Sequence, residues 1–288
     1  MSKTVVLYNP LSGSFSFDHV KKSFPEYDLR DVTASVDYAS LAAELGADDA
    51  LILCGGDGTL NRFANDVKDL SFACDILYYP TGSGNDFAFD VVGAKTSDIP
   101  FTVKEYLKNL PTVTVNGNTY RFINGVGFGI DGYCCEVGDE LRKTSDKPVD
   151  YTMIAIKGLL FYYKPTNAKV TVDGETTEFR KVWLAPAMFG RYYGGGMMPT
   201  PGQTRADATV STLIFHGSGK LKTLMIFPSI FKGAHVKHTK HVKVLTGKEI
   251  SVEFDEPRAI QIDGETILGV TSYTAKAPVV APVPVAAE

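Results

Sequence analysis

The residues best suited to chemistry in this 288-residue sequence lie in LILCGGDGTLN, residues 51–61, where four apolar residues precede a glycine-rich turn around Asp57. Glycines adopt backbone angles closed to other residues and let a ligand approach the main chain. A buried strand, a glycine turn and a helix start together direct backbone N–H groups at a phosphate. The stretch therefore predicts a phosphate site in which Asp57 faces Mg²⁺, a ligand hydroxyl or a water network. Taken alone, it is equally compatible with a simple tight turn.

Two further turn-rich segments strengthen the phosphate prediction. An apolar run also precedes NPLSG (residues 9–13) and PTGSGND (residues 80–86). If these runs are parallel strands, Asn9, Asp57 and Asp86 all lie just past strand ends, where open α/β sheets bind ligands. This convergence predicts a nucleotide site.

The tripeptide Asp-Gly-Glu occurs twice, and its carboxylates are candidates for acid–base chemistry. The copy at 173–175 separates two strand-like runs, so we expect a hairpin turn there. The copy at 263–265 follows the apolar run Ala259–Ile262. In an extended conformation Asp263 and Glu265 would share one face of a strand, because successive side chains alternate.

Composition excludes several classes of protein. The 44% hydrophobic and 22% charged residues are typical of a globular protein with a substantial core. A net charge of −4 argues against a nucleic-acid partner. The four cysteines show no C-x-x-C spacing, which argues against a zinc finger or disulfide framework, and the absence of a signal peptide favours the reducing cytoplasm. No apolar run approaches the roughly 18 residues that cross a bilayer.

The order of the expected elements predicts two domains. Early strand-like runs alternate with helical segments, which is typical of a parallel α/β sheet. Later short runs, interrupted by one helix around Tyr151–Tyr163, indicate a β-sandwich. We therefore expect an α/β domain at 1–112, a β-sandwich at 113–275 and a loose tail at 276–288. The expected strands are 4–8, 28–33, 51–54, 76–79, 112–115, 120–124, 168–172, 181–185, 209–215, 242–245, 249–254 and 259–262, with early helices at 38–45 and 60–67.

Six motifs occur in the order seen in the diacylglycerol kinase catalytic-domain family, which the chain resembles from about Val5 to Glu265. They are NPLSG, GGDGTLN, PTGSGNDF, NGVGFGID, GGGMMPTPG and IDGE. The family includes bacterial diacylglycerol kinases and sphingosine and ceramide kinases. The resemblance implies a Rossmann-like nucleotide-binding domain followed by a β-sandwich domain, with the active site in the cleft between them.

The same resemblance implies a lipid kinase that uses ATP and Mg²⁺. Diacylglycerol, converted to phosphatidic acid in phospholipid biosynthesis, is the first candidate substrate, and a sphingoid base, ceramide or another lipid alcohol is the alternative. NAD kinases share GGDG, but the second loop here is GSGND and lacks their Asn-Glu pair. A nucleotide- or lipid-binding regulator without catalysis is the alternative of another class.

The resemblance also implies roles for individual residues. Thr33 matches a position that contacts ATP in relatives, and Ser83 stands where relatives usually carry threonine. Asp57 and Asp86 would share a network around Mg²⁺, and Asp207 matches an acid that holds a structural Mg²⁺ in some bacterial relatives. The residues placed at the nucleotide are Asn9, Pro10, Leu11, Ser12, Gly13, Thr33, Gly55, Gly56, Asp57, Gly58, Thr59, Leu60, Asn61, Ser83, Asn85 and Asp86.

The late motif IDGE is where the resemblance places the acid–base step. Phosphoryl transfer depends mostly on positioning and charge neutralisation, with a base that takes the proton of the nucleophile. Glu265 would accept the proton of the lipid hydroxyl while Asp263 orients it, and Asp263 as the base is the alternative. Asp57 completes the expected catalytic set through the metal network.

Three departures from the family pattern affect this reading. Asp207 is followed by Ala208 instead of glycine, which weakens the expected structural metal loop. Residues 112–115 contain no acid near Val113, where several relatives have one, so the inner metal network is reduced. The segment after Gly13 also lacks the basic residues of some relatives.

Two segments bear on how a lipid would be reached. Residues 220–243 set six lysines around an apolar stripe, which is typical of an interfacial membrane segment or of a core-facing helix with a solvated lysine face. Tyr192–Met198 would line a lipid pocket or form a glycine-rich turn. We expect a cytoplasmic protein without transmembrane segments that reaches its lipid at the inner membrane face. The sequence leaves a homodimer open.

Overall fold

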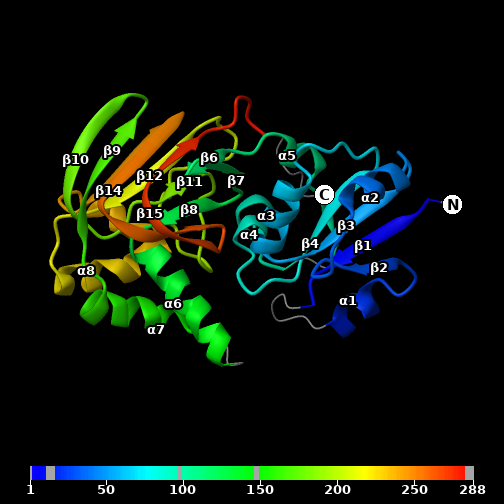
Figure 1. Ribbon diagram of the computed structural model, residues 1–288, viewed down its shortest axis with the longest axis horizontal. Helices are drawn as coiled ribbons and strands as arrows, with labels where there is room; N and C mark the ends of the chain where they lie inside the picture. Colours follow the sequence, from blue (N-terminus) through cyan, green and yellow to red (C-terminus); the bar gives the residue numbers. More distant parts are fainter. Residues whose placement is uncertain (1, 11–16, 97–98, 146–148, 283–288) are drawn as a thin grey trace. The chain divides into compact units, whose positions relative to one another are not determined.

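The computed structural model describes residues 2–10, 17–96, 99–145 and 149–282. The chain divides into two compact units (Figure 1). Unit 1 contains Met1–Leu110 together with the C-terminal residues from Val280, and unit 2 is Pro111–Val279.

Unit 1 is built on a five-stranded sheet with the order β2-β1-β3-β4-β5. The first four strands are parallel to one another, and β5 runs antiparallel to β4. This confirms the predicted α/β domain. The strands are β1 (Thr4–Tyr8), β2 (Asp28–Asp31), β3 (Ala50–Gly55), β4 (Asp75–Pro80) and β5 (Phe101–Thr102), and the helices are α1 (Phe17–Ser23), α2 (Tyr38–Glu44), α3 (Asp57–Asp66), α4 (Asp86–Val92) and α5 (Lys104–Lys108).

The apolar runs of the sequence become strands because helices cover the sheet. Residues 5–7 of β1 and 51–54 of β3 are buried without interruption, as strands covered on both faces require. The helix α3 turns Leu60, Phe63 and Ala64 inward at the three-to-four residue spacing of an amphipathic helix.

The start of α3 differs from the prediction. The helix begins at Asp57 and not at Leu60, so much of the expected glycine loop is the first helical turn. Gly56 forms the N-cap in an extended conformation. An acid in the first turn is favoured by the helix dipole, which explains why Asp57 can open the helix.

Unit 2 contains an antiparallel ten-stranded sheet with the order β13-β12-β11-β8-β14-β15-β6-β7, to which β9 and β10 attach through β14. The long β14 pairs with β9 over Ile250–Phe254 and with β8 over Ile260–Ile262, with an irregularity in between. Such a bulge lets one strand serve two layers of a sandwich, as predicted for this half. The strands are β6 (Thr112–Val115), β7 (Asn118–Arg121), β8 (Gly125–Phe128), β9 (Thr166–Val172), β10 (Glu175–Val182), β11 (Ala187–Met188), β12 (Val210–Phe215), β13 (Val242–Gly247), β14 (Glu249–Ile262) and β15 (Glu265–Lys276).

Unit 2 also contains more helix than the sequence indicated. The helix expected around Tyr151–Tyr163 is present as α7 and η1, but the expectation of a single helix is wrong. The helical elements are α6 (Ile130–Thr144), α7 (Tyr151–Lys157), η1 (Gly158–Tyr162), α8 (Lys220–Ile226), η2 (Phe227–Lys232) and η3 (Ala234–Lys237). A buried cluster that includes Leu159, Trp183, Phe215 and Ile226 joins these helices to the strands.

Several strand boundaries also differ from the prediction. The runs 249–254 and 259–262 are one strand, β14, and β7 ends at Arg121 and not at 124. The strand β15, which continues to Lys276, was not expected, and it contains Gly269 with a φ of 69°. Among the residues described, no helix is both long and apolar enough to span a membrane.

Candidate active-site residues

The carboxyl ends of β1, β3 and β4 lie at one edge of the unit 1 sheet. The backbone N–H of Asn9 donates to the Cys54 carbonyl at 3.2 Å, and that of Thr81 donates to the Gly55 carbonyl at 2.9 Å. The Asn9 side chain also donates from Nδ2 to Thr59 Oγ1 at 3.0 Å, which ties the first segment to α3. The three motifs singled out in this half of the sequence therefore meet in space.

Asp57 joins the two glycine loops directly. Its carboxylate accepts the backbone N–H of Asp86 at 2.8 Å and that of Phe87 at 3.0 Å. These groups open α4, and the first N–H groups of a helix have no partner within it. The acid that repels phosphate in isolation thus caps the second loop, and a carboxylate has further lone pairs that can accept other ligands.

Close backbone packing explains two glycines of these loops. A side chain at Gly82 would overlap the backbone of Gly56 and come 2.6 Å from Asn85 Oδ1. Asn85 has the left-handed φ of 48° and donates from Nδ2 to the carbonyls of Gly82 and Lys95, both at 2.7 Å. The loop after β4 is therefore held in shape by its own side chains before any ligand arrives.

The ten-residue helix α3 presents its N-terminus at the same sheet edge. The free N–H groups of a first turn and the helix dipole favour a phosphate at this position. Thr33 is exposed, and both its N–H and its hydroxyl donate to Asp31 Oδ1 at 2.7 Å. Ser83 is exposed in the loop before α4. The predicted contacts Leu11, Ser12 and Gly13 lie outside the described residues.

In unit 2, Asp263 and Gly264 form the turn between β14 and β15. Their φ angles are 45° and 100°, so the segment is not extended, and the condition under which Asp263 and Glu265 would share one face of a strand is not met. The Asp-Gly preference for hairpin turns decides the conformation, as it does in the confirmed turn at Asp173 and Gly174.

The Asp263 carboxylate is occupied by the main chain of a distant segment. It accepts the backbone N–H groups of Ile123, Asn124 and Gly125 at 2.5, 2.8 and 2.9 Å. Glu265 follows as the exposed first residue of β15. Of the two predicted carboxylates, Asp263 therefore fixes the hairpin.

Arg205 also binds this segment, and sequence reasoning missed it. Its Nη1 donates to the Ile123 carbonyl at 2.5 Å and its Nη2 to Asn124 Oδ1 at 2.6 Å. Arg205 lies two residues before Asp207, the predicted metal ligand, which is exposed. No pattern in the sequence marked the arginine, because its partners are backbone and amide oxygens more than 80 residues away.

A buried carboxyl in unit 2 was also not singled out. Asp131, in the first turn of α6, accepts a hydrogen bond from the Tyr193 hydroxyl at 2.5 Å. Burial raises the pKa of Asp131 to about 7, although the hydrogen bond from Tyr193 acts in the opposite direction. Perturbed acids of this kind often mark functional sites.

The glycine-rich segment around Tyr193 forms a turn. Tyr193 and Met197 exchange backbone hydrogen bonds at 3.1 and 3.0 Å, and Gly194, Gly195 and Gly196 between them all have positive φ. Of the two readings of Tyr192–Met198, the turn is the one observed, and it aims Tyr193 at Asp131.

Asp131 lies near the hairpin that Asp263 and Gly264 form between β14 and β15. A side chain at Gly127 would touch both Asp131 Oδ2 at 2.5 Å and Gln261 Nε2 at 2.7 Å. Gln261 in turn accepts the Gly264 N–H through Oε1 at 2.7 Å. Buried polar side chains of α6 and β14 therefore meet at Gly127 of β8, beside the hairpin.

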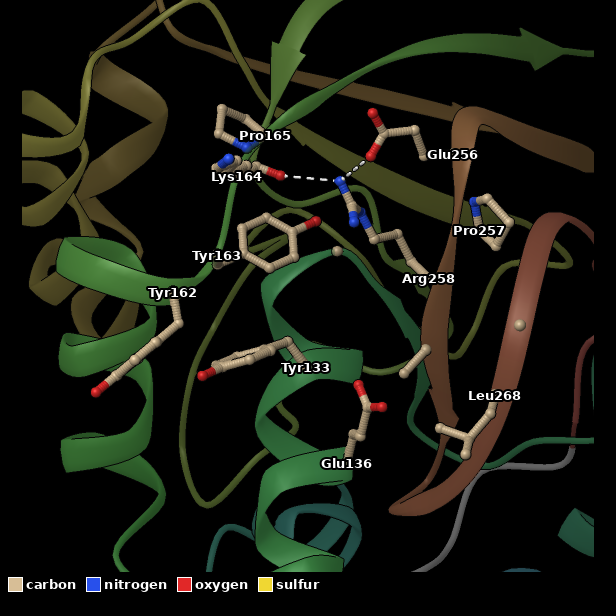
Figure 2. Close-up of a pocket in the computed structure, with 13 residues that line it drawn as sticks. Tyr133, Glu136, Tyr162, Tyr163, Lys164, Pro165, Glu256, Pro257, Arg258 and Leu268 are labelled. Carbon is tan, nitrogen blue, oxygen red and sulfur yellow. Dashed lines mark hydrogen bonds and ion pairs between the residues drawn. The ribbon is translucent and has the colours of Figure 1, made fainter.

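A cavity of about 410 Å³ opens in unit 2 between α6, the end of η1 and the strands β14 and β15 (Figure 2). Arg258 crosses it, donating from Nη2 to Glu256 at 2.8 Å and to the Lys164 carbonyl at 3.2 Å. Among the described residues, the buried Arg258 Nε and Tyr163 hydroxyl have no hydrogen-bond partner. Figure 2 shows the Tyr163 hydroxyl turned toward Arg258. The cavity can therefore hold a hydrogen-bond acceptor, but none of the predicted site residues lines it.

Of the three carboxylates predicted to bind magnesium, Asp57 and Asp86 suit such an ion and Asp207 does not. Within the described ranges, no three His, Cys, Asp or Glu side chains gather where they could hold a metal. Mg²⁺ in phosphoryl-transfer sites usually relies on one or two carboxylates, substrate phosphates and waters, a demand that Asp57 and the buried Asp86 can meet. Exposed Asp207 has no such support, and we derive no step from a metal there.

Two family models match the chain and together cover most of it. Residues 3–114 match the diacylglycerol kinase catalytic domain, and residues 124–284 match the YegS C-terminal NAD kinase beta sandwich-like domain. The chain belongs to the diacylglycerol kinase catalytic-domain family, whose members are lipid kinases, phosphotransferases that act on an alcohol group. A kinase of this family uses ATP.

Individual relatives agree with this assignment. The chain is 26% identical to "Putative lipid kinase YtlR" of Bacillus subtilis, over 77% of this chain and 75% of that protein. It is also 26% identical to "Diacylglycerol kinase" of Mycobacterium tuberculosis H37Rv, over 74% of this chain and 69% of that protein. A solved structure titled as a diacylglycerol kinase of Bacillus anthracis superposes with a TM-score of 0.61 at 18% identity, covering 98% and 97% of the two chains. That likeness shows the fold.

Proposed function

We propose that the protein transfers the γ-phosphoryl group of ATP to the hydroxyl of diacylglycerol, giving phosphatidic acid and ADP. The observation that carries the proposal is the Asp57 carboxylate, which links two phosphate-type loops at the carboxyl edge of the unit 1 sheet. Membership of a lipid kinase family supports the reaction class. The names of relatives from M. tuberculosis and B. anthracis favour diacylglycerol as the acceptor.

In this proposal the first turn of α3 and the loop before it receive the ATP phosphates. Backbone N–H groups need no conformational change to do so, because Asp57 and Asn85 already hold both loops in place. Asp57 and Asp86 would hold Mg²⁺ through their remaining oxygen lone pairs, and the ion would neutralise charge on the phosphates.

Glu265 is the proposed base. The lipid hydroxyl oxygen forms a bond to the γ-phosphorus, the bond from that phosphorus to the bridging oxygen breaks, and ADP leaves with the electron pair. The hydroxyl proton passes to the Glu265 carboxylate. Asp263 is a positioning residue here, because its oxygens already accept three backbone N–H groups.

The test is transfer of labelled γ-phosphate from ATP with Mg²⁺ to diacylglycerol, sphingosine and ceramide in mixed micelles. We expect phosphatidic acid from the wild type and a loss of about 10²-fold or more for Glu265→Gln, in line with the loss of a general base. The matched control is Glu175→Gln, in the other Asp-Gly-Glu hairpin of the same unit. Equal activity of Glu265→Gln and wild type would remove the base assignment.

The acceptor is decided by the same assay. A phosphorylated sphingoid base or ceramide, with no phosphatidic acid, would replace diacylglycerol by that lipid. Saturable ATP binding without any lipid product would favour a nucleotide-binding regulator. We also propose that the lipid is reached at the cytoplasmic face of a membrane, since long-chain diacylglycerol resides in the bilayer.

A further inference from the structure

Four large apolar side chains are exposed on neighbouring elements of unit 2. Phe161 and Tyr162 of η1 and Leu221 and Met225 of α8 are each 67–71% exposed. Lys220 Nζ donates to the Leu160 carbonyl at 2.9 Å and so ties α8 to η1. We call these four residues the η1–α8 face.

The inward side of the same elements already fills the core. Leu159 and Ile226 belong to the buried cluster around Trp183, while Leu221 and Met225, four residues apart, share the opposite side of α8. The exposed residues are therefore not needed to build unit 2. Large apolar groups gathered at the surface in this way mark an interaction site.

The charge around the face identifies the kind of partner. The segments that contain η1 and α8, residues 151–172 and 208–248, hold ten lysines and no aspartate or glutamate, in a chain of net charge −4. The exposed Lys157, Lys222 and Lys232 lie on the elements of the face or next to them. The neighbouring α6 carries acids as well as bases, and its Glu136 lines the same cavity as Tyr162.

We infer that the η1–α8 face docks on a bilayer containing anionic lipids, with its four apolar side chains in the interface and the lysines at the headgroups. Aromatic residues favour this depth, and each lysine near an anionic surface contributes attraction that salt weakens. The inference rests on the proposed function in one respect, since a lipid kinase has a lipid bilayer as its partner. The residues that it assigns to docking have no role in the proposed reaction.

The experiment is co-sedimentation of the full chain with vesicles of phosphatidylcholine, alone or with about 30% phosphatidylglycerol. The test variants are Leu221→Ser/Met225→Ser and Lys222→Glu/Lys232→Glu. The matched controls are Tyr27→Ser/Val244→Ser, which alter exposed apolar residues elsewhere, and Lys21→Glu/Lys22→Glu on α1. None of these four control residues belongs to the η1–α8 face.

We expect wild type and both controls to bind the anionic vesicles, with affinity falling as salt is raised. Each test variant should lose about tenfold or more in affinity, as removal of apolar contact or reversal of two charges predicts. Test variants that bind as well as wild type would overturn the inference. So would a wild-type dimer, detected by light scattering, that Leu221→Ser/Met225→Ser dissociates, because the occupant would then be a second copy.

A separate readout distinguishes failure of docking from failure of the proposed function. Phosphorylation of a short-chain diacylglycerol dissolved without vesicles should be unchanged in the test variants. If the wild type phosphorylates no lipid but its vesicle binding is weakened in the test variants, the docking inference stands and the proposed kinase function is wrong. If the wild type is an active kinase and the test variants bind vesicles as well as it does, the proposed function stands and the docking inference is wrong.

Discussion

Asp57 and Asp263 use their carboxylates in the same way at different places in the chain. Each accepts backbone N–H groups from a segment remote in sequence, two in the case of Asp57 and three in that of Asp263. A hydrogen bond to a charged group is stronger than a neutral one, and a buried N–H left without a partner costs further free energy. Residues that a motif marks for chemistry can therefore be required for local structure as well.

Replacing Asp263 by Asn tests this structural role. Asn tolerates the left-handed φ of the turn, so the substitution removes acceptor capacity without straining the hairpin. We expect the free energy of unfolding to fall by about 2–4 kcal/mol, measured by urea denaturation. In the control Asp173→Asn, where the exposed carboxylate accepts two N–H groups, the loss should be about 1 kcal/mol. Equal losses in the two hairpins would contradict the assignment.

The buried Asp131 predicts a pH dependence of stability. Its pKa is raised from 3.8 to about 7, so its contribution is complete below about pH 4 and is lost as pH rises through 7. Asp131→Asn keeps an oxygen acceptor for Tyr193 and cannot ionise. The wild type, relative to this variant, should lose on the order of a few kcal/mol of unfolding free energy between pH 4 and 8. Parallel pH profiles of the two proteins would show that Asp131 stays ionised in the fold.

At the scale of elements, the close contact between the two phosphate-type loops carries a further prediction. Gly82→Ala forces a Cβ into the backbone of Gly56. We expect a loss of about 1–3 kcal/mol in stability and weaker ATP binding by calorimetry, because the first loop must move. Gly202→Ala is the control, since a Cβ there meets nothing within 4 Å. Unchanged ATP affinity in Gly82→Ala would mean that the loops do not have to stay in contact to bind nucleotide.

The elements that the sequence predicted correctly are those whose conformation is determined by residues close together in the chain. The buried runs of β1, β3 and β4 are bounded by glycine and proline turns, so periodicity and turn residues were sufficient. The helix α6 was missed because its sequence, IDGYCCEVGDELRKT, has low intrinsic helix propensity and is stabilised by packing that only Gly132 permits against Ala259.

The hairpin at Asp263 shows a second reason why sequence-based prediction was incomplete. The Asp-Gly turn preference was visible, but the sequence left the conformation of residues 263–265 open. The partners that decide the role of Asp263 lie about 140 residues earlier in the chain. The contact between Arg205 and Asn124 was beyond sequence reasoning for the same reason, since no local pattern links a side chain to a distant carbonyl or amide oxygen.

At the scale of the whole molecule, the division into two units gives the nucleotide proposal a spatial test. A ligand that binds only the folded state stabilises it by about 2.7 kcal/mol at a hundredfold excess over Kd. If ATP binds unit 1, amide hydrogen exchange in β3, α3 and the start of α4 should slow by as much as about 10²-fold, the factor that this free energy represents. The strands β9 and β10 of unit 2 hold none of the proposed nucleotide contacts and serve as an internal reference. In Asp57→Asn, which loses part of the link between the loops, the slowing should be smaller at the start of α4 than in β3. Protection confined to unit 2, or equal throughout the chain, would place the nucleotide elsewhere, because exchange slows first where the ligand opposes local opening.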